Sequence, residues 1–188
     1  MMRILKRLKD IWSSAWTRPT RNSLVAFIGG CAVLFLLLIL DNDGFIPVLD
    51  HANLAFHEAG HVFFGIFGDV ANLYGGTLGQ FVFPLVIVIS FWLRRQPIGY
   101  AVGWIWFFEN WRYVATYVAD ARARVLPMAG TGPKIHDWWA ILRRWDALQH
   151  DTKIASVFNG LALAGILAAV LWLVWRSLRK EKTARLAA

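Results

Sequence analysis

Two histidines and a glutamate lie close together in the segment His57-Glu58-Ala59-Gly60-His61. In a helix, residues four positions apart point to the same side one turn apart, so both imidazoles can bind one Zn²⁺. Glu58 lies beside them and can accept the proton of a zinc-bound water. This spacing predicts a hydrolytic metal centre in which His57 and His61 are ligands and Glu58 is the catalytic base.

The flanks of this motif are apolar enough for a lipid environment. Residues 54–56 before it and 62–67 after it contain no charged side chain. Ionisable groups are costly inside a membrane and are usually functional there, and a bound divalent cation compensates them. We therefore favour a metal site over a chance occurrence of the motif in a soluble helix.

The composition also indicates a membrane protein, because 57% of the residues are hydrophobic, only 17% are charged and the mean hydropathy is +0.46. The net charge of +8 comes from Lys and Arg in the two tails and in loops beside apolar runs. This distribution follows the positive-inside rule and does not point to nucleic acid. Cys31 is the single cysteine, so no intrachain disulfide can form. We expect a multi-pass integral protein of the cell (inner) membrane with cytoplasmic tails.

The expected fold is all-α, a polytopic membrane protein with about four to six transmembrane or re-entrant helices plus amphipathic interfacial helices. An amphipathic cytoplasmic segment, residues 1–22, precedes a membrane-embedded metallopeptidase-like domain, residues 23–175, and a basic C-terminal tail, residues 176–188, follows it. The apolar runs expected to form helices are 23–40, 51–68, 77–93, 98–118 and 154–175.

The loop 121–153 has two halves of different character. Its first half contains prolines and glycines, whereas Trp138 to Leu148 has the spacing of a short interfacial helix.

Two cytoplasmic tails require an even number of crossings, but the apolar runs are odd in number. We therefore expect one run not to cross completely, either the metal-motif helix or the stretch Gly75 to Pro84, whose glycines and proline favour irregular backbone.

The metal motif on an apolar helix is followed by Gly75-Gly76-Thr77-Leu78-Gly79-Gln80-Phe81-Val82-Phe83-Pro84, and together they resemble the site-2 protease family of intramembrane zinc metallopeptidases over residues 51–126. In that family the third zinc ligand is an Asp on a later transmembrane helix, usually within Leu-Asp-Gly. This chain lacks Leu-Asp-Gly, and its nearest counterpart is Asn110 followed by Asp120. The resemblance implies cleavage of a membrane protein or peptide in or near the bilayer.

By the same resemblance, Gly79, Gln80 and Asn110 are expected to line or hold an extended substrate. Gln80 and Asn110 could equally form packing hydrogen bonds between helices. The sequence does not choose between these two roles.

A catalytic zinc needs a third protein ligand and one open position. Asp120 is the first candidate, because it ends an apolar helix on a face that it shares with Glu109, Tyr113 and Thr116. Such a polar face is expected to point into the protein. The competing interpretation is a helix-end carboxylate paired with a nearby arginine.

Other third ligands remain open. His136-Asp137 in the loop is the second choice, and His150-Asp151 ranks last together with a site that has no third protein ligand. His51 lies nearly two turns from Glu58, so we expect it to contact a ligand or the substrate rather than the metal.

These observations predict a membrane-embedded zinc metalloendopeptidase. The alternative is a non-catalytic membrane protein that binds a metal for a structural or regulatory role, although such a site has no need of Glu58 as a base. A membrane di-iron oxygenase also uses a His-x-x-x-His box, but it needs more histidines than the 5 in this chain.

Overall fold

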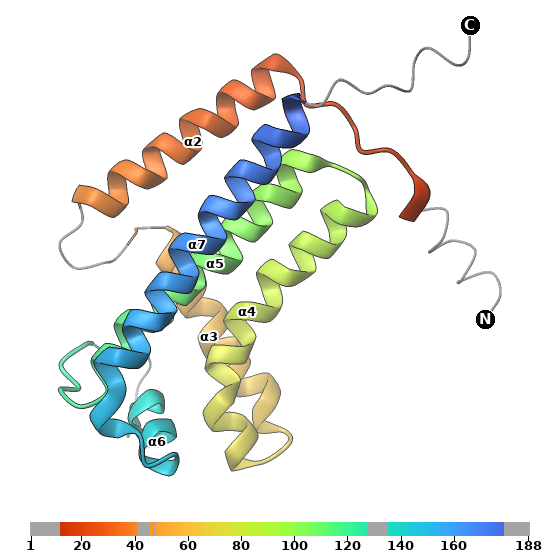
Figure 1. Ribbon diagram of the computed structural model, residues 1–188. Helices are drawn as coiled ribbons and strands as arrows, with labels where there is room; N and C mark the ends of the chain where they lie inside the picture. The colour runs from red at the N-terminus through yellow and green to blue at the C-terminus, as the bar shows by residue number, and fades with distance from the viewer. Residues whose placement is uncertain (1–11, 41–45, 47, 128–134, 179–188) are drawn as a thin grey trace, which may run out of the picture.

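The computed structural model describes residues 12–40, 46, 48–127 and 135–178. The described chain is all-helical, as the sequence predicts (Figure 1). Its elements are α2 (Arg21–Leu40), α3 (Leu49–Gly65), α4 (Asp69–Leu93), α5 (Pro97–Ala119), α6 (Asp137–Arg144), the short 3-10 turn η1 (Leu148–His150) and α7 (Asp151–Leu178). The residues 1–11 and 179–188 of the two predicted tail segments lie outside the described residues.

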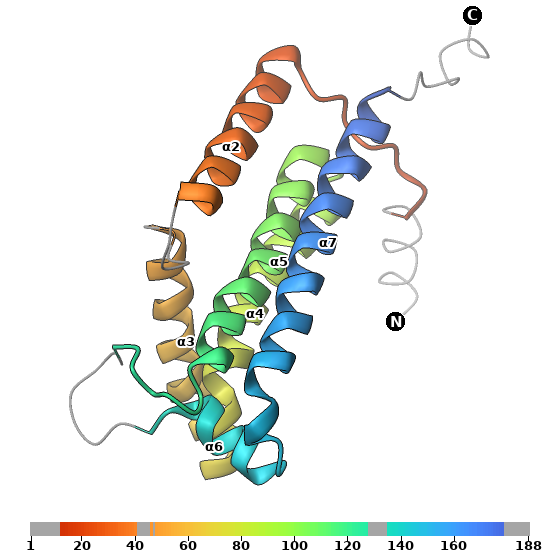
Figure 2. The ribbon, with the colours of Figure 1, turned by 60° about the vertical axis from the view of Figure 1, so that its left-hand side comes forward.

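The directions of the helices determine which helix ends lie together at each end of the bundle. The chain runs through α2 and then α3 in the same direction, α4 returns, α5 descends again and α7 returns (Figures 1 and 2). The start of α2, the α4–α5 turn and the end of α7 therefore lie at one end of the molecule. The α3–α4 turn, α6 and the start of α7 lie at the other.

The helices α3 and α4 meet through glycines. A Cβ added at Gly60 would collide with the backbone of Gly75 and lie 2.9 Å from the Cα of Gly79, so the two backbones are in direct contact. The expectation of irregular backbone between Gly75 and Pro84 is wrong, because α4 is continuous through both. The glycines serve as a flat packing surface, and such close contact explains why they do not break the helix.

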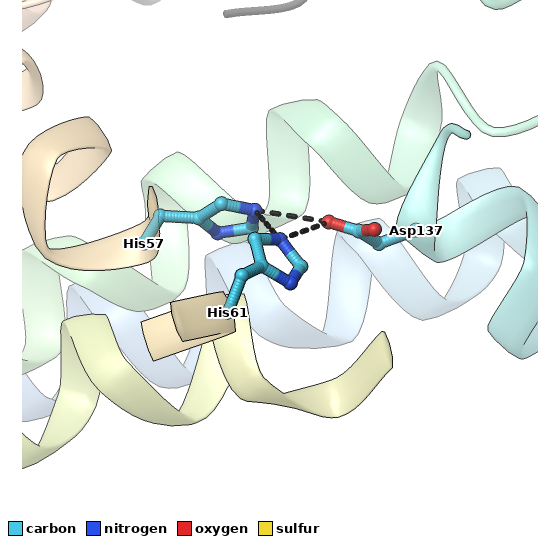
Figure 3. Close-up of side chains that lie close together, drawn as sticks. All are labelled: His57, His61 and Asp137. Atoms are coloured by element: carbon cyan, nitrogen blue, oxygen red, sulfur yellow. Dashed lines mark hydrogen bonds and ion pairs between the residues drawn. The ribbon is translucent and has the colours of Figure 1, made fainter. Parts of the chain in front are cut away.

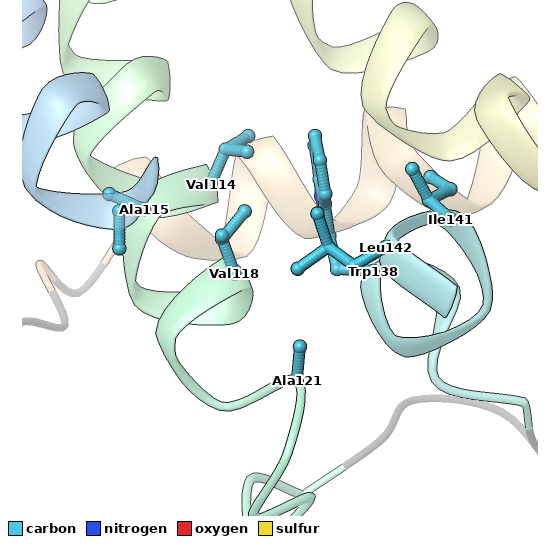
Figure 4. Packing of buried hydrophobic residues seen from close by; sticks show 8 residues of the cluster. Val114, Ala115, Val118, Ala121, Trp138, Ile141 and Leu142 are labelled. Carbon is cyan, nitrogen blue, oxygen red and sulfur yellow. The ribbon is translucent and has the colours of Figure 1, made fainter. Parts of the chain in front are cut away.

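The helix α6 is held against α5 and α7 by a hydrophobic cluster (Figure 4). Its Trp138, Ile141 and Leu142 are buried, which confirms a short helix with one apolar face in the predicted place. That face packs on the bundle, whereas Trp145 just beyond the helix is 54% exposed. The cluster consists of Val114, Ala115, Val118, Ala121, Trp138, Ile141, Leu142 and Ala155.

Two helical stretches, Asp69–Leu93 and Leu148–Leu178, are long and apolar enough to cross a membrane, and Arg21–Leu37 is a shorter apolar helix. In both long stretches only 22% of the most apolar window is buried inside the protein. Apolar side chains on both stretches are exposed, among them Val82 and Val86 on α4 and Leu163 and Leu167 on α7.

Candidate metal centre

Three side chains converge on one point between α3 and α6 (Figure 3). The Nε2 atom of His57 lies 2.9 Å from Oδ2 of Asp137, and the Nε2 atom of His61 lies 3.1 Å from the same oxygen. The two Nε2 atoms are 3.1 Å apart. His57 and Asp137 are buried, and the side chain of His61 is 20% exposed.

This arrangement fits a zinc ion. In a tetrahedral site with bonds of about 2.0–2.1 Å, ligand atoms lie about 3.3 Å apart. The three observed separations of 2.9, 3.1 and 3.1 Å are close to that value, so a small outward movement is enough. Two imidazoles and one carboxylate leave the fourth position for water, which is the ligand set of a catalytic site.

The local sequence explains how α3 presents its two histidines. Asp50, Asn53, His57 and Gly60 recur at spacings of three and four and form the buried face of α3. The Nδ1 atom of His61 lies 2.8 Å from the carbonyl oxygen of Asn72 in α4, which orients its ring with Nε2 toward His57. A ligand histidine is commonly oriented by such a contact at its other nitrogen.

Gly76 makes room for both rings. A Cβ at this position would lie 2.5 Å from Nε2 of His57 and 2.5 Å from Nε2 of His61. Only glycine leaves space there for two imidazoles. The glycine of α4 beside the motif is thus part of the centre.

Asp137 reaches the histidines because the segment before it is fastened to α5. Oδ2 of Asp120 lies 3.3 Å from Nε2 of His136, and Nδ1 of His136 accepts the N–H of Trp139 and so caps α6. The backbone N–H of Asp137 donates to the hydroxyl of Tyr117, whose ring lies 4.1 Å from that of His136. These contacts fix the first turn of α6 in place.

Electrostatics in this segment follow from burial and from the neighbouring rings. Burial lowers the pKa of His136, which favours its neutral form. Burial alone would raise the pKa of Asp137, but the hydrogen bonds to His57 and His61 outweigh it and the pKa is lowered. Asp137 is therefore held as a carboxylate, the form that binds a metal.

The first choice of third ligand, Asp120, is not at the centre. Its carboxylate accepts the N–H groups of Val125 and Leu126 and pairs with His136. The structure brings Asp137, from the second choice, to the histidines instead. The physical reason is that Asp120 is already bonded to Val125, Leu126 and His136, and Asp137 beside His136 reaches the histidines instead.

Glu58 lies next to His57 on the exposed side of α3. Its carboxylate is close enough for its charge to act on His61, Tyr113 and Tyr117. The role of Glu58 as the catalytic base stays a prediction from the motif.

A buried polar network, which the sequence did not predict, adjoins the centre. The amide nitrogen of Asn53 donates to Oδ1 of Asp50 at 3.1 Å and to Oε2 of Glu109 at 2.9 Å. Its oxygen accepts the indole N–H of Trp106 at 2.8 Å. The available signal was the spacing of Asp50 and Asn53, which puts both on the face of α3 that carries His57.

The remaining predicted residues lie elsewhere. Gly79 packs against the backbone of α3, and the side chains of Gln80 and Asn110 are buried in α4 and α5. Neither Gln80 Oε1 nor Asn110 Oδ1 has a hydrogen-bond partner among the described residues. His51 and His150 are exposed and do not join the metal group.

Comparison with known proteins gives no relative. No protein-family model, no curated protein and no solved structure matches this chain.

Proposed function

We propose that this protein is a membrane-embedded zinc metalloendopeptidase that hydrolyses peptide bonds in or near the bilayer. The observation that carries the proposal is the convergence of His57, His61 and Asp137 beside Glu58. Two neutral nitrogen ligands, one carboxylate and an adjacent second carboxylate form the minimal set for metal-assisted hydrolysis.

The membrane setting is supported by the outward-facing apolar side chains of the long helices. On α3 itself, Val62 and Phe63 are 78% and 61% exposed and directly follow His61. Exposed apolar surface on this scale is typical of contact with lipid or with an apolar partner. The substrate is therefore a membrane-associated polypeptide rather than a soluble folded protein.

The reaction divides between the metal and the chain. A zinc ion held by His57, His61 and Asp137 would supply Lewis acidity, which would lower the pKa of a water toward ~7 and polarise the scissile carbonyl. Glu58 takes the proton of that water as its oxygen attacks the carbonyl carbon, and then delivers the proton to the leaving amine nitrogen as the C–N bond breaks. His57, His61 and Asp137 would hold the ion, while Tyr117 bonds to the backbone of Asp137 and the neighbouring His136 bonds to Asp120.

The test compares the wild-type protein with Glu58→Gln. Each is co-expressed with a panel of tagged single-span proteins that contain a Gly- or Pro-weakened segment, and fragments are read on gels. We expect fragments with the wild type, none with Glu58→Gln, and full zinc content in both proteins. The matched control is Asp69→Asn, the same chemical change at an exposed carboxylate of α4, which should cleave normally.

A zinc-containing protein that produces no Glu58-dependent fragment from any panel member or native membrane protein would refute the enzymatic proposal. The metal would then be structural or regulatory. A fragment that persists in Glu58→Gln would show that another group acts as the base.

A further inference from the structure

The two ends of the helical bundle differ in charge. The end formed by the start of α2, the α4–α5 turn and the end of α7 carries Arg18, Arg21, Arg94, Arg95 and Arg176. Within the described residues this end contains no Asp or Glu. We call it the arginine end.

The N-terminal described segment belongs to the arginine end through direct contacts. The N–H of Thr17 donates to the carbonyl of Arg95 at 2.9 Å, and the Nε of Arg95 donates to the hydroxyl of Ser14 at 3.1 Å. The ring of Trp16 lies 5.1 Å from that of Trp172 near the end of α7. The arginines of three separate segments are thus gathered at one end.

The opposite end, which we call the metal end, holds the metal centre and carries both signs of charge. Of its acidic groups, Glu58, Asp120 and Asp137 belong to the site or its support, and Asp151 pairs with Arg122 at 2.7 Å. Among the described residues the basic side chains are nearly balanced, five at the arginine end against six elsewhere. The excess is in the sequence of the tails: 13 of the 20 lysines and arginines lie in residues 1–22, 94–95 and 176–188, and seven lie between these segments, namely Arg112, Arg122, Arg124, Lys134, Arg143, Arg144 and Lys153.

From this asymmetry, and resting on the membrane location in the proposed function, we infer that the metal centre faces the non-cytoplasmic side of the membrane. Lysine and arginine beside membrane-spanning segments are retained in the cytoplasm, and acidic residues contribute little to this rule, so the 13 basic residues of 1–22, 94–95 and 176–188 outweigh the seven others. The arginine end is then cytoplasmic. The metal end, at the far end of α4, α5 and α7, is on the other side (Figures 1 and 2).

The helix directions agree with this orientation. Because α2 and α3 run the same way, they count as one pass, and α4, α5 and α7 add three, so the start of α2 and the end of α7 share a side. The helix α3, which carries the metal motif, is the part of the first pass that lies nearer the metal end. This resolves the conflict between an odd number of apolar runs and an even number of crossings.

The orientation defines the substrate class. A polypeptide reaches His61 and Glu58 from the outer surface, beside the exposed Val62, Phe63 and Ile66 of the α3 face and its end. The substrate is therefore a membrane-anchored polypeptide whose extended, cleavable segment lies next to the outer interface. A segment buried near the cytoplasmic interface would be too far from the metal end.

Single cysteines test the orientation without any reference to catalysis. In a Cys31→Ser background, which removes the one native cysteine, Ala15→Cys marks the arginine end and Gln149→Cys marks the metal end, and both positions are exposed. Spheroplasts that express each variant are treated with a membrane-impermeant maleimide before or after lysis, and labelling is expressed relative to that in SDS. We expect Gln149→Cys to react in intact spheroplasts and Ala15→Cys to react only after lysis.

Reaction of Ala15→Cys alone in intact spheroplasts, or equal reaction of both positions, would overturn the inference. A second arm uses two single-span reporters, with the weakened segment next to the outer or the inner interface. Glu58-dependent cleavage of the outer reporter alone is expected, and cleavage of the inner one alone would overturn the substrate class. If neither is cleaved while the cysteines report the expected orientation, the proposed enzymatic function fails and the orientation stands.

Discussion

Gly76→Ala is the substitution that most sharply separates the metal centre from the fold. The added methyl carbon would lie 2.5 Å from the Nε2 atoms of both His57 and His61. Ordinary contact begins at 3.4 Å, so each ring must move by roughly 0.9 Å. Without a metal the rings can rotate away, because each is the free end of its side chain. With a metal they cannot, because ligand distances are held to about 0.2 Å.

The expected loss follows from that displacement. A misplacement of about 1 Å in a positioned group lowers the rate of a catalysed reaction by about 100-fold, and we take the same factor for the affinity for zinc. Applied to zinc binding, this is about 2.8 kcal/mol of binding free energy. The fold of the metal-free protein should be unaffected or slightly stabilised, since alanine is better than glycine inside a helix by up to ~1 kcal/mol.

The assay measures zinc affinity by competition with a chelator, and the thermal unfolding of the metal-free protein, both in detergent. The matched control is Gly160→Ala, because a Cβ at Gly160 meets nothing within 4 Å and should leave both values nearly unchanged. Gly60→Ala should instead lose the fold, since its methyl group meets the backbone of α4. Wild-type zinc affinity in Gly76→Ala would refute the placement of the histidines.

Two further predictions concern the support of the site. Asp120→Ala should weaken zinc binding by about 10–100-fold without abolishing it, because it removes the contact to His136 and leaves all three ligands in place. Competition with a chelator measures the affinity. Complete loss of zinc would return Asp120 to the ligand set. Asn53→Ala should lower the free energy of unfolding by about 2–5 kcal/mol, because Asp50 and Glu109 lose the amide that bridges them. Thermal unfolding measures the change. An unchanged unfolding temperature would contradict the bridging role of Asn53.

The sequence predicts α2, α5 and α7 to within a few residues, since long uncharged runs leave little choice of structure. It fails for α4, where the helix begins at Asp69 and continues through Gly75 and Pro84. Local preference treats these residues as breakers. The close contact with Gly60 of α3 decides otherwise, and such a contact between distant segments leaves no local pattern.

The candidate site shows the same division. His57, His61 and Glu58 follow from a five-residue pattern, because a single helix positions all of them. The third ligand, Asp137, does not follow from this pattern. It lies 76 residues after His61 in the chain, and only the tertiary fold brings it to the histidines. Asp120 and Asp137 are both aspartates at the end of a helix, so the local sequence does not distinguish them. Only the packing of α6 on α5 shows that Asp120 holds the loop while Asp137 reaches the histidines.

The zinc content of purified protein tests the central claim most directly. Wild type is expected to carry close to one zinc per chain, and His57→Ala and Asp137→Asn are each expected to lose it, because each change leaves two ligands. Asp146→Asn, the same change at an exposed carboxylate, is the control and should keep the metal. Full zinc content in Asp137→Asn together with loss in His57→Ala would contradict the His57, His61 and Asp137 site on which the account depends.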